Sequence, residues 1–122
     1  MIALVVGMTG ALGATVRFVL DGEIRRRLPS TFPFATAFIN ISGSFLLGVV
    51  AGLVLFHQLP DTLRLLVGVG FCGGYTTFST ANAETVRLAQ QGRVLLAVAN
   101  ALGPLVLSLL ACGAGLLLTS AG

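Results

Sequence analysis

The residues most able to do chemistry in this sequence lie together, in the segment Gly70–Thr80. This segment combines a cluster of glycines with four hydroxyl residues and two phenylalanines, in the middle of an otherwise apolar stretch. In lipid every backbone polar group needs a partner, so an interrupted helix is tolerated only where it is buried in protein or lines a wet cavity. The segment is therefore predicted to be the working part of the molecule and to form part of a permeation path.

Polar residues also recur at helical spacing in two other apolar segments. Thr36, Asn40 and Ser44 are spaced i, i+4 and i+8, which places them on one face of a helix. The last apolar segment repeats the pattern with Asn100, Pro104, Ser108 and Cys112. A single hydroxyl either serves such a stripe or bonds back to its own helix. Asn40 is different, because an amide with two donors and an acceptor must find partners near mid-membrane, which indicates a functional or interface role.

Phe78 comes shortly after the glycine cluster and lies between hydroxyl residues. The edge of an aromatic ring carries partial positive charge. Ring edges, together with hydroxyl and amide donors, could replace part of the water around a small, hard anion. The alternative is that Phe78 packs against lipid or a neighbouring helix, as phenylalanine in membrane helices normally does.

The composition identifies an integral membrane protein. Of 122 residues, 56% are hydrophobic and only 9% are charged, whereas a soluble domain carries about 25% charged residues. The net charge of +3 is small and dispersed, which gives a nucleic-acid partner little support. No nucleophile–base set or metal cluster can be assembled within the apolar segments, so an enzyme is not expected.

The predicted fold is all-α, with four transmembrane helices in a single membrane domain of residues 1–122. A helix that spans the bilayer needs about 20 mostly apolar residues. The four segments that meet this requirement are residues 2–20, 33–56, 62–88 and 94–118, and the third is expected to be broken near its middle. Small residues at close-packing spacing let membrane helices approach one another. Since four short helices cannot easily enclose a polar path, we expect an oligomer, most simply a dimer.

The arginines predict one orientation in the cell membrane. The two loops after the first and third spans share one side of the membrane, and that side carries six of the seven arginines. The opposite side, with both termini, carries only Arg64. By the positive-inside rule the two loops are cytoplasmic and both termini lie outside.

The ionisable residues bear on one competing function. The four carboxylates, Asp21, Glu23, Asp61 and Glu84, all lie at or near span ends. A small four-helix, proton-coupled multidrug exporter needs a carboxylate near mid-membrane, so that alternative is weakened. Arg17 is the most deeply placed charge; it either snorkels to the interface or belongs to an anion vestibule.

Three segments together resemble the Fluc (CrcB-type) fluoride channel family over nearly the whole chain. They are Gly10–Ala14 leading to Arg17, Phe38–Gly48 and Gly70–Thr80. The resemblance implies an antiparallel dimer with two narrow pores that exports fluoride passively and so protects the cell from its toxicity.

The resemblance also implies roles for individual residues. The backbone carbonyls of Gly73 and Thr76 would bind a structural Na⁺ at the dimer centre, where glycine permits the unwound backbone. Arg17 matches a vestibule arginine. The implied pore-lining residues are Asn40, Phe78, Ser79, Thr80 and Ser108.

One position departs from the family pattern. Where the family usually has a second phenylalanine after Phe78, this chain has Ala81. In the family each pore uses the first ring of one subunit and the second ring of the other, so a homodimer of this chain would lack a ring in both pores. We therefore expect a heterodimer with an oppositely oriented homologous subunit. A homodimer that tolerates Ala81 and a non-conducting partner subunit remain as alternatives.

Overall fold

The computed structural model describes residues 1–29 and 32–121, and within these ranges the chain forms helices and no strands. The helices are α1 (Ile2–Arg27), α2 (Phe34–His57), α3 (Asp61–Leu63), η1 (Arg64–Cys72), α4 (Gly73–Tyr75), α5 (Phe78–Gln90) and α6 (Val94–Ala121). The predicted all-α fold is confirmed. Ser30 and Thr31 of the predicted first loop, and Gly122 of the predicted domain, lie outside the described residues.

The third span is one helix in two parts. Elements α3, η1 and α4 follow one another without a gap, and the wider π-helical turns of η1 make up most of this first part. Thr76 and Thr77 then have extended backbone, with ψ angles of 156° and 107°, and α5 begins at Phe78. The predicted break near the middle of the third span is confirmed, and it falls inside the segment rich in glycine and hydroxyl residues.

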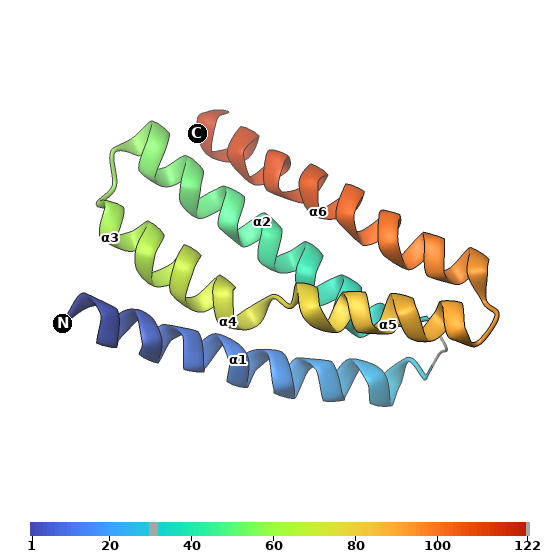
Figure 1. The fold of residues 1–122 in the computed structure, drawn as a ribbon. Helices are drawn as coiled ribbons and strands as arrows, with labels where there is room; N and C mark the ends of the chain where they lie inside the picture. The colour runs from blue at the N-terminus through green and yellow to red at the C-terminus, as the bar shows by residue number, and fades with distance from the viewer. Residues whose placement is uncertain (30–31, 122) are drawn as a thin grey trace.

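The helices pack as two pairs joined through the third span. Helix α2 lies along α6, and α1 lies along η1 and α4, while α5 continues past the break beside α6 (Figure 1). The two halves of the third span therefore contact different neighbours. The N-terminus, the C-terminal end of α6 and the link from α2 to α3 all lie at one end of the bundle (Figure 1).

Close helix packing depends on small residues, as the sequence predicts. A Cβ atom added to Gly48 on α2 would collide with the backbone carbonyl of Cys112 on α6. A Cβ atom on Gly74 would collide with the backbone carbonyl of Gly10 on α1. Each pair of backbones approaches so closely that only glycine fits. Gly7 takes no part in such a contact, since a Cβ atom there would meet nothing within 4 Å.

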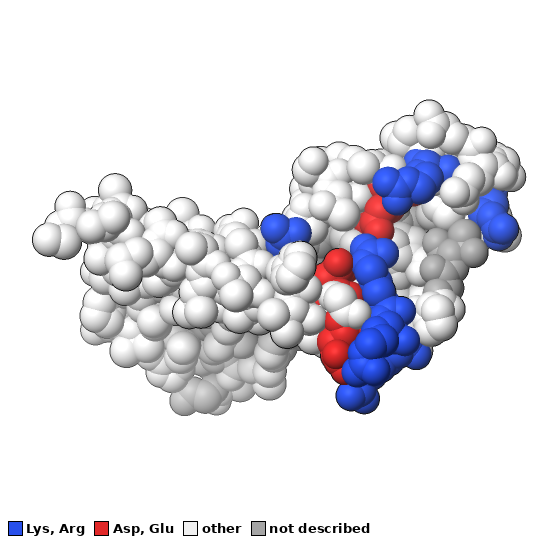
Figure 2. All heavy atoms as spheres, turned by 90° about the horizontal axis from the view of Figure 1, so that it is seen from below, with Lys and Arg blue, Asp and Glu red and all other residues white. Residues whose placement is uncertain are grey.

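Charged residues extend α1 beyond its apolar part. The predicted membrane segment ends at residue 20, but the helix continues to Arg27. Ion pairs one turn apart support this extension, with Arg25 Nε 2.9 Å from Asp21 Oδ1 and Arg27 Nε 2.7 Å from Glu23 Oε1. Arginine and carboxylate side chains gather toward one end of the molecule on the face seen in Figure 2.

Three of the described helices, α1, α2 and α6, are each long and apolar enough to cross a membrane. The third span is divided by its break, so its two parts are each shorter. Large apolar side chains on α1 and α6, among them Phe18 and Leu95, are exposed on the outside of the bundle. The chain is therefore a multi-pass membrane protein.

We predict that Gly48→Ala destabilises the fold by about 1–3 kcal/mol, the usual cost of overpacking a well-packed contact. The added methyl group would force α2 and α6 apart at the Cys112 carbonyl. The free energy of unfolding in detergent measures this effect. The matched control is Gly113→Ala on α6, where the added Cβ atom would meet nothing within 4 Å. Equal stability of the two variants would contradict the prediction.

Candidate functional site

The side chain of Asn40 holds the break in the third helix. Its Oδ1 accepts a hydrogen bond from the backbone N–H of Thr77 at 2.7 Å, and its Nδ2 donates to the Thr77 carbonyl oxygen at 3.0 Å. One amide side chain on α2 thus pairs with both backbone polar groups of a residue that has left the helix. The cost of an unpaired backbone group in lipid is removed, and the extended conformation of Thr77 becomes stable.

Both ends of the break are also capped. The hydroxyl of Thr77 accepts a hydrogen bond from the backbone N–H of Thr80 at 3.2 Å, which is a normal N-cap for α5. On the other side, the hydroxyl of Thr76 donates to the Cys72 carbonyl oxygen at 2.8 Å. Hydroxyl side chains within the break therefore pair with backbone groups on both of its sides.

Arg17 on α1 binds the C-terminal end of the first half of the third span. Its Nε donates to the carbonyl oxygen of Gly74 at 3.2 Å. The C-terminal end of a helix carries partial negative charge, which favours a cation there. Arg17 thus lies on α1 against the half-helix end, and it is not among the residues that line the cavity beside the break.

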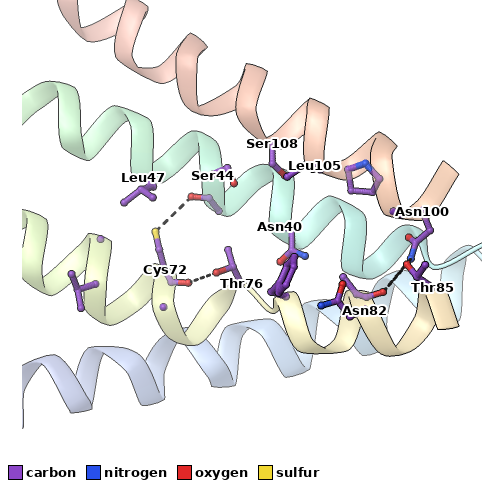
Figure 3. Close-up of a pocket in the computed structure, with 18 residues that line it drawn as sticks. Asn40, Ser44, Leu47, Cys72, Thr76, Asn82, Thr85, Asn100, Leu105 and Ser108 are labelled. Atoms are coloured by element: carbon purple, nitrogen blue, oxygen red, sulfur yellow. Dashed lines mark hydrogen bonds between the residues drawn. The ribbon is translucent and has the colours of Figure 1, made fainter. Parts of the chain in front are cut away.

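A cavity of about 490 Å³ opens beside the break, between α2, the third span and α6 (Figure 3). We call it the polar groove. Its polar lining residues are Asn40, Ser44, Thr76, Asn82, Thr85, Asn100 and Ser108. Phe78 also lines it and is 75% exposed. Its described lining contains no carboxylate or arginine, and apolar side chains such as Leu47, Val69 and Leu105 lie between the polar ones, so the groove is uncharged and mixed in polarity.

The structure brings most of the predicted pore residues together. The polar groove is lined by Asn40 from α2, Phe78 from α5 and Ser108 from α6. Gly73 and Thr76 also line it. Ser79 and Thr80 are outside this lining set. The Oγ1 atoms of Thr80 and Thr77 are 3.0 Å apart, within hydrogen-bonding distance. Which of these residues an ion touches stays a prediction.

Residues outside the predicted set also belong to the site. Asn100 on α6 is buried, and its Nδ2 donates to Thr85 Oγ1 at 2.8 Å and to the Ala81 carbonyl oxygen at 3.3 Å. Asn100 therefore positions α5 beside the groove. The helical spacing from Asn100 to Ser108 in the sequence is the signal that could have marked it.

Thr36 does not extend the polar lining, although its spacing from Asn40 places it on the same helix face. Its hydroxyl accepts a hydrogen bond from Arg25 Nη2 at 3.3 Å. The same nitrogen lies 2.9 Å from Glu84 Oε2, and Glu84 is buried. Sequence reasoning placed Glu84 near a span end but missed this pairing, because nothing local links residues so far apart in the chain.

The backbone at the break fits a hard cation. Apart from regular helical bonds, no hydrogen bond from the described residues reaches the carbonyl oxygen of Gly73 or Thr76. Hard cations take oxygen ligands of this kind. A Cβ atom at Gly73 would meet nothing within 4 Å, so the backbone there is open to its surroundings. These two carbonyl oxygens are therefore compatible with the predicted Na⁺ as its ligands.

Most of the sequence matches a known protein family. Residues 4–116 match the family described as "CrcB-like protein, Camphor Resistance (CrcB)". The chain belongs to the CrcB family. The resemblance noted from its three sequence segments is thereby confirmed.

Several members of the CrcB family with given names are similar to this chain over most of its length. It is 50% identical over 116 residues to "Fluoride-specific ion channel FluC 1" of Leifsonia xyli subsp. xyli (strain CTCB07), with 95% of this chain and 85% of the relative covered. It is 44% identical over 104 residues to "Fluoride-specific ion channel FluC 2" of Mycobacterium tuberculosis (strain ATCC 25618 / H37Rv), with 85% and 79% covered. It is 41% identical over 114 residues to "Fluoride-specific ion channel FluC" of Nitrobacter winogradskyi, with 93% and 90% covered.

We predict that Asn40→Ala destabilises the fold by about 1–3 kcal/mol, the cost of leaving buried polar groups without partners. Both backbone groups of Thr77 lose their hydrogen bonds in this variant. Unfolding in detergent measures the stability, and hydrogen exchange reports whether the Thr77 amide opens more often.

The matched control for this prediction is Asn82→Ala. Asn82 lines the same groove, is exposed, and its side chain makes no hydrogen bond with the described residues. We expect its stability to change by less than about 0.5 kcal/mol, as for an ordinary surface substitution. Asn40→Ala would contradict the proposed pinning if it behaved like this control and left exchange at Thr77 unchanged.

Proposed function

We propose that this chain is a subunit of a fluoride-specific ion channel that exports fluoride passively and lowers its concentration in the cytoplasm. The observation that carries the proposal is the broken third helix, pinned by Asn40 beside a groove of neutral polar residues. We propose fluoride as the ion because the names of its CrcB-family relatives specify it. Those names describe channels, and no enzymatic activity is proposed.

The groove offers hydrogen-bond donors to a small anion. Asn40 uses one N–H of its amide on Thr77, and an amide nitrogen carries two, so one remains. The hydroxyls of Ser44 and Ser108 make no hydrogen bond to other described residues, so both are available. Thr76 Oγ1 already donates to Cys72. The exposed edge of Phe78 adds partial positive charge.

These groups suit a compact anion that loses its water on entry. Selectivity in a channel depends on how well the lining groups replace the hydration shell, and on the width available. Conduction also requires that the anion bind weakly enough to leave, and the described lining contains no arginine to hold it. The donors on α2, α6 and the third span would each replace part of the hydration shell in turn.

We further propose that two subunits complete each pore, in an antiparallel dimer. A single subunit leaves the groove open on one side, with Phe78 at its exposed rim. A structural Na⁺ at the dimer centre would be held by the Gly73 and Thr76 carbonyls of both subunits. Open carbonyl oxygens at the break support this role, and loss of dimers in sodium-free buffer would test it.

The orientation and the partner follow from the charges and from residue 81. We place the arginine-rich loops in the cytoplasm and both termini outside; one-sided labelling of an Arg93→Cys variant tests this.

A chain fixed in one orientation needs an oppositely oriented homologue to form an antiparallel pair. Ala81 lines the groove where a second ring is expected. Relatives with numbered names, FluC 1 and FluC 2, are compatible with paired subunits.

We predict that liposomes containing this protein alone release little fluoride, and that release becomes rapid when the oppositely oriented homologue is added. A fluoride electrode measures the efflux without any proton gradient, and chloride efflux is the control. Rapid, selective release by the chain alone would establish the channel but contradict the need for a second subunit. If the pair also released nothing, the channel proposal itself would be wrong.

We predict that Ala81→Phe raises fluoride efflux by the chain reconstituted together with the oppositely oriented homologue. The variant supplies the second ring within the same sequence, and an aromatic contact contributes about 0.5–1.5 kcal/mol, which corresponds to at most about a tenfold rate increase. The control is Ala83→Phe, which adds the same ring on α5 at an exposed position outside the groove. An equal effect of both variants, or none from Ala81→Phe, would argue against the missing-ring hypothesis.

A further inference from the structure

A second cavity, of about 720 Å³, lies away from the polar groove, between α1, α2 and α6. We call it the apolar groove. Every described residue that lines it is apolar. Among them are Leu20 and Ile24 on α1, Leu28 directly after it, and Gly103 and Leu107 on α6. Among the described residues, Pro104 alone lines both cavities. The apolar groove therefore differs from the polar groove in offering an ion no polar side chain.

The length of the apolar groove matches one leaflet of a bilayer. Its lining on α6 runs from Ala99 to Leu107, inside the predicted fourth span. Its other wall runs from Leu20, where the predicted first span ends, to Leu28, the C-cap of α1. Each stretch spans about 12 Å at the rise of an α-helix, close to half of the hydrocarbon thickness of about 30 Å. An acyl chain that follows these helices would fill the groove from the membrane surface inward.

The groove ends beside unneutralised positive charge. Arg27 lies one turn from Ile24 on α1 and adjoins Leu28, so it sits at the rim. Arg26 and Arg27 both bond to the single carboxylate of Glu23, and their side chains are 68% and 72% exposed. Arg26 and Arg27 thus share one carboxylate, whereas Arg25 on the same helix has two carboxylate partners, Asp21 and Glu84, so the excess of positive charge is local to Arg26 and Arg27. Arg93, at the start of α6, has no ion pair with the described residues.

We propose that the apolar groove binds one anionic phospholipid. One acyl chain lies against Leu20, Ile24 and Leu107, and the phosphate headgroup contacts Arg27 at the rim. The guanidinium group suits this role because its planar N–H groups match phosphate oxygens. A neutral lipid fills the groove equally well but gains less at Arg27. Binding is therefore selective for anionic headgroups.

The opposite end of the molecule lacks this combination. Arg64, the arginine at that end, forms an ion pair with Asp61, with Nε and Oδ1 2.8 Å apart. Its guanidinium charge is offset by a carboxylate of its own. The lipid site thus belongs to the arginine-rich end, where six arginines face three carboxylates.

Native mass spectrometry of the detergent-solubilised protein tests the proposal, with phosphatidylglycerol and phosphatidylcholine of identical acyl chains as probes. We expect one retained phosphatidylglycerol per chain and about fivefold weaker retention of phosphatidylcholine, from about 1 kcal/mol per arginine near the headgroup. Arg27→Gln is expected to remove most of this preference. Arg64→Gln, at the opposite end, is expected to leave it unchanged.

A second variant fills the groove itself. Gly103→Leu places a side chain into the cavity, and a Cβ atom there would meet nothing within 4 Å. We expect it to abolish retention of both lipids. The control is Gly113→Leu, equally open on α6 but outside the groove, which is expected to retain lipid.

Three results would overturn the proposal. They are equal retention of both lipids by the unaltered protein, full retention by Gly103→Leu, and a change in oligomer mass in Gly103→Leu without a change in retained lipid. The last would make the apolar groove a contact between subunits. None of these readouts depends on fluoride transport, so failure here is distinguishable from failure of the proposed channel function.

Discussion

A backbone that leaves its helix inside a membrane needs partners for its N–H and C=O groups, and side chains from two other helices supply several of them here. Asn40 on α2 pairs with both polar groups of Thr77, and Arg17 on α1 pairs with the Gly74 carbonyl. The break is therefore fixed from two sides. Since the same break exposes Phe78 and the polar groove, the geometry of the candidate site follows from these hydrogen bonds.

The two halves of the third span pack against different helices. The half before the break packs on α1 through glycine contacts, and the half after it packs on α6. Helix α1 reaches α5 through the Arg25–Glu84 ion pair, and Arg25 also bonds to Thr36 on α2. One guanidinium group thus links three helices at the arginine-rich end, which explains why α1 remains helical well past its apolar part.

Much of the fold could be predicted because it depends on local composition. Apolar length marks the spans, and the mixture of glycine and hydroxyl residues marks the break at Thr76. The need of Asn40 for partners was also predictable. Its actual partner, Thr77, was not, because the pairing depends on how α2 and the third span approach each other. The same reason hid the burial of Glu84 and the diversion of Thr36 from the polar lining to Arg25.

The hydrogen bond from Asn100 to residue 81 has an evolutionary consequence. It ends on the Ala81 carbonyl, a group that every amino acid possesses. The anchoring of α5 to α6 is therefore indifferent to which side chain stands at that position. After a gene duplication, one copy could lose an aromatic ring there by a single substitution while its scaffold stayed intact. Such a copy would keep the packing of α5 on α6, so folding would not select against the substitution.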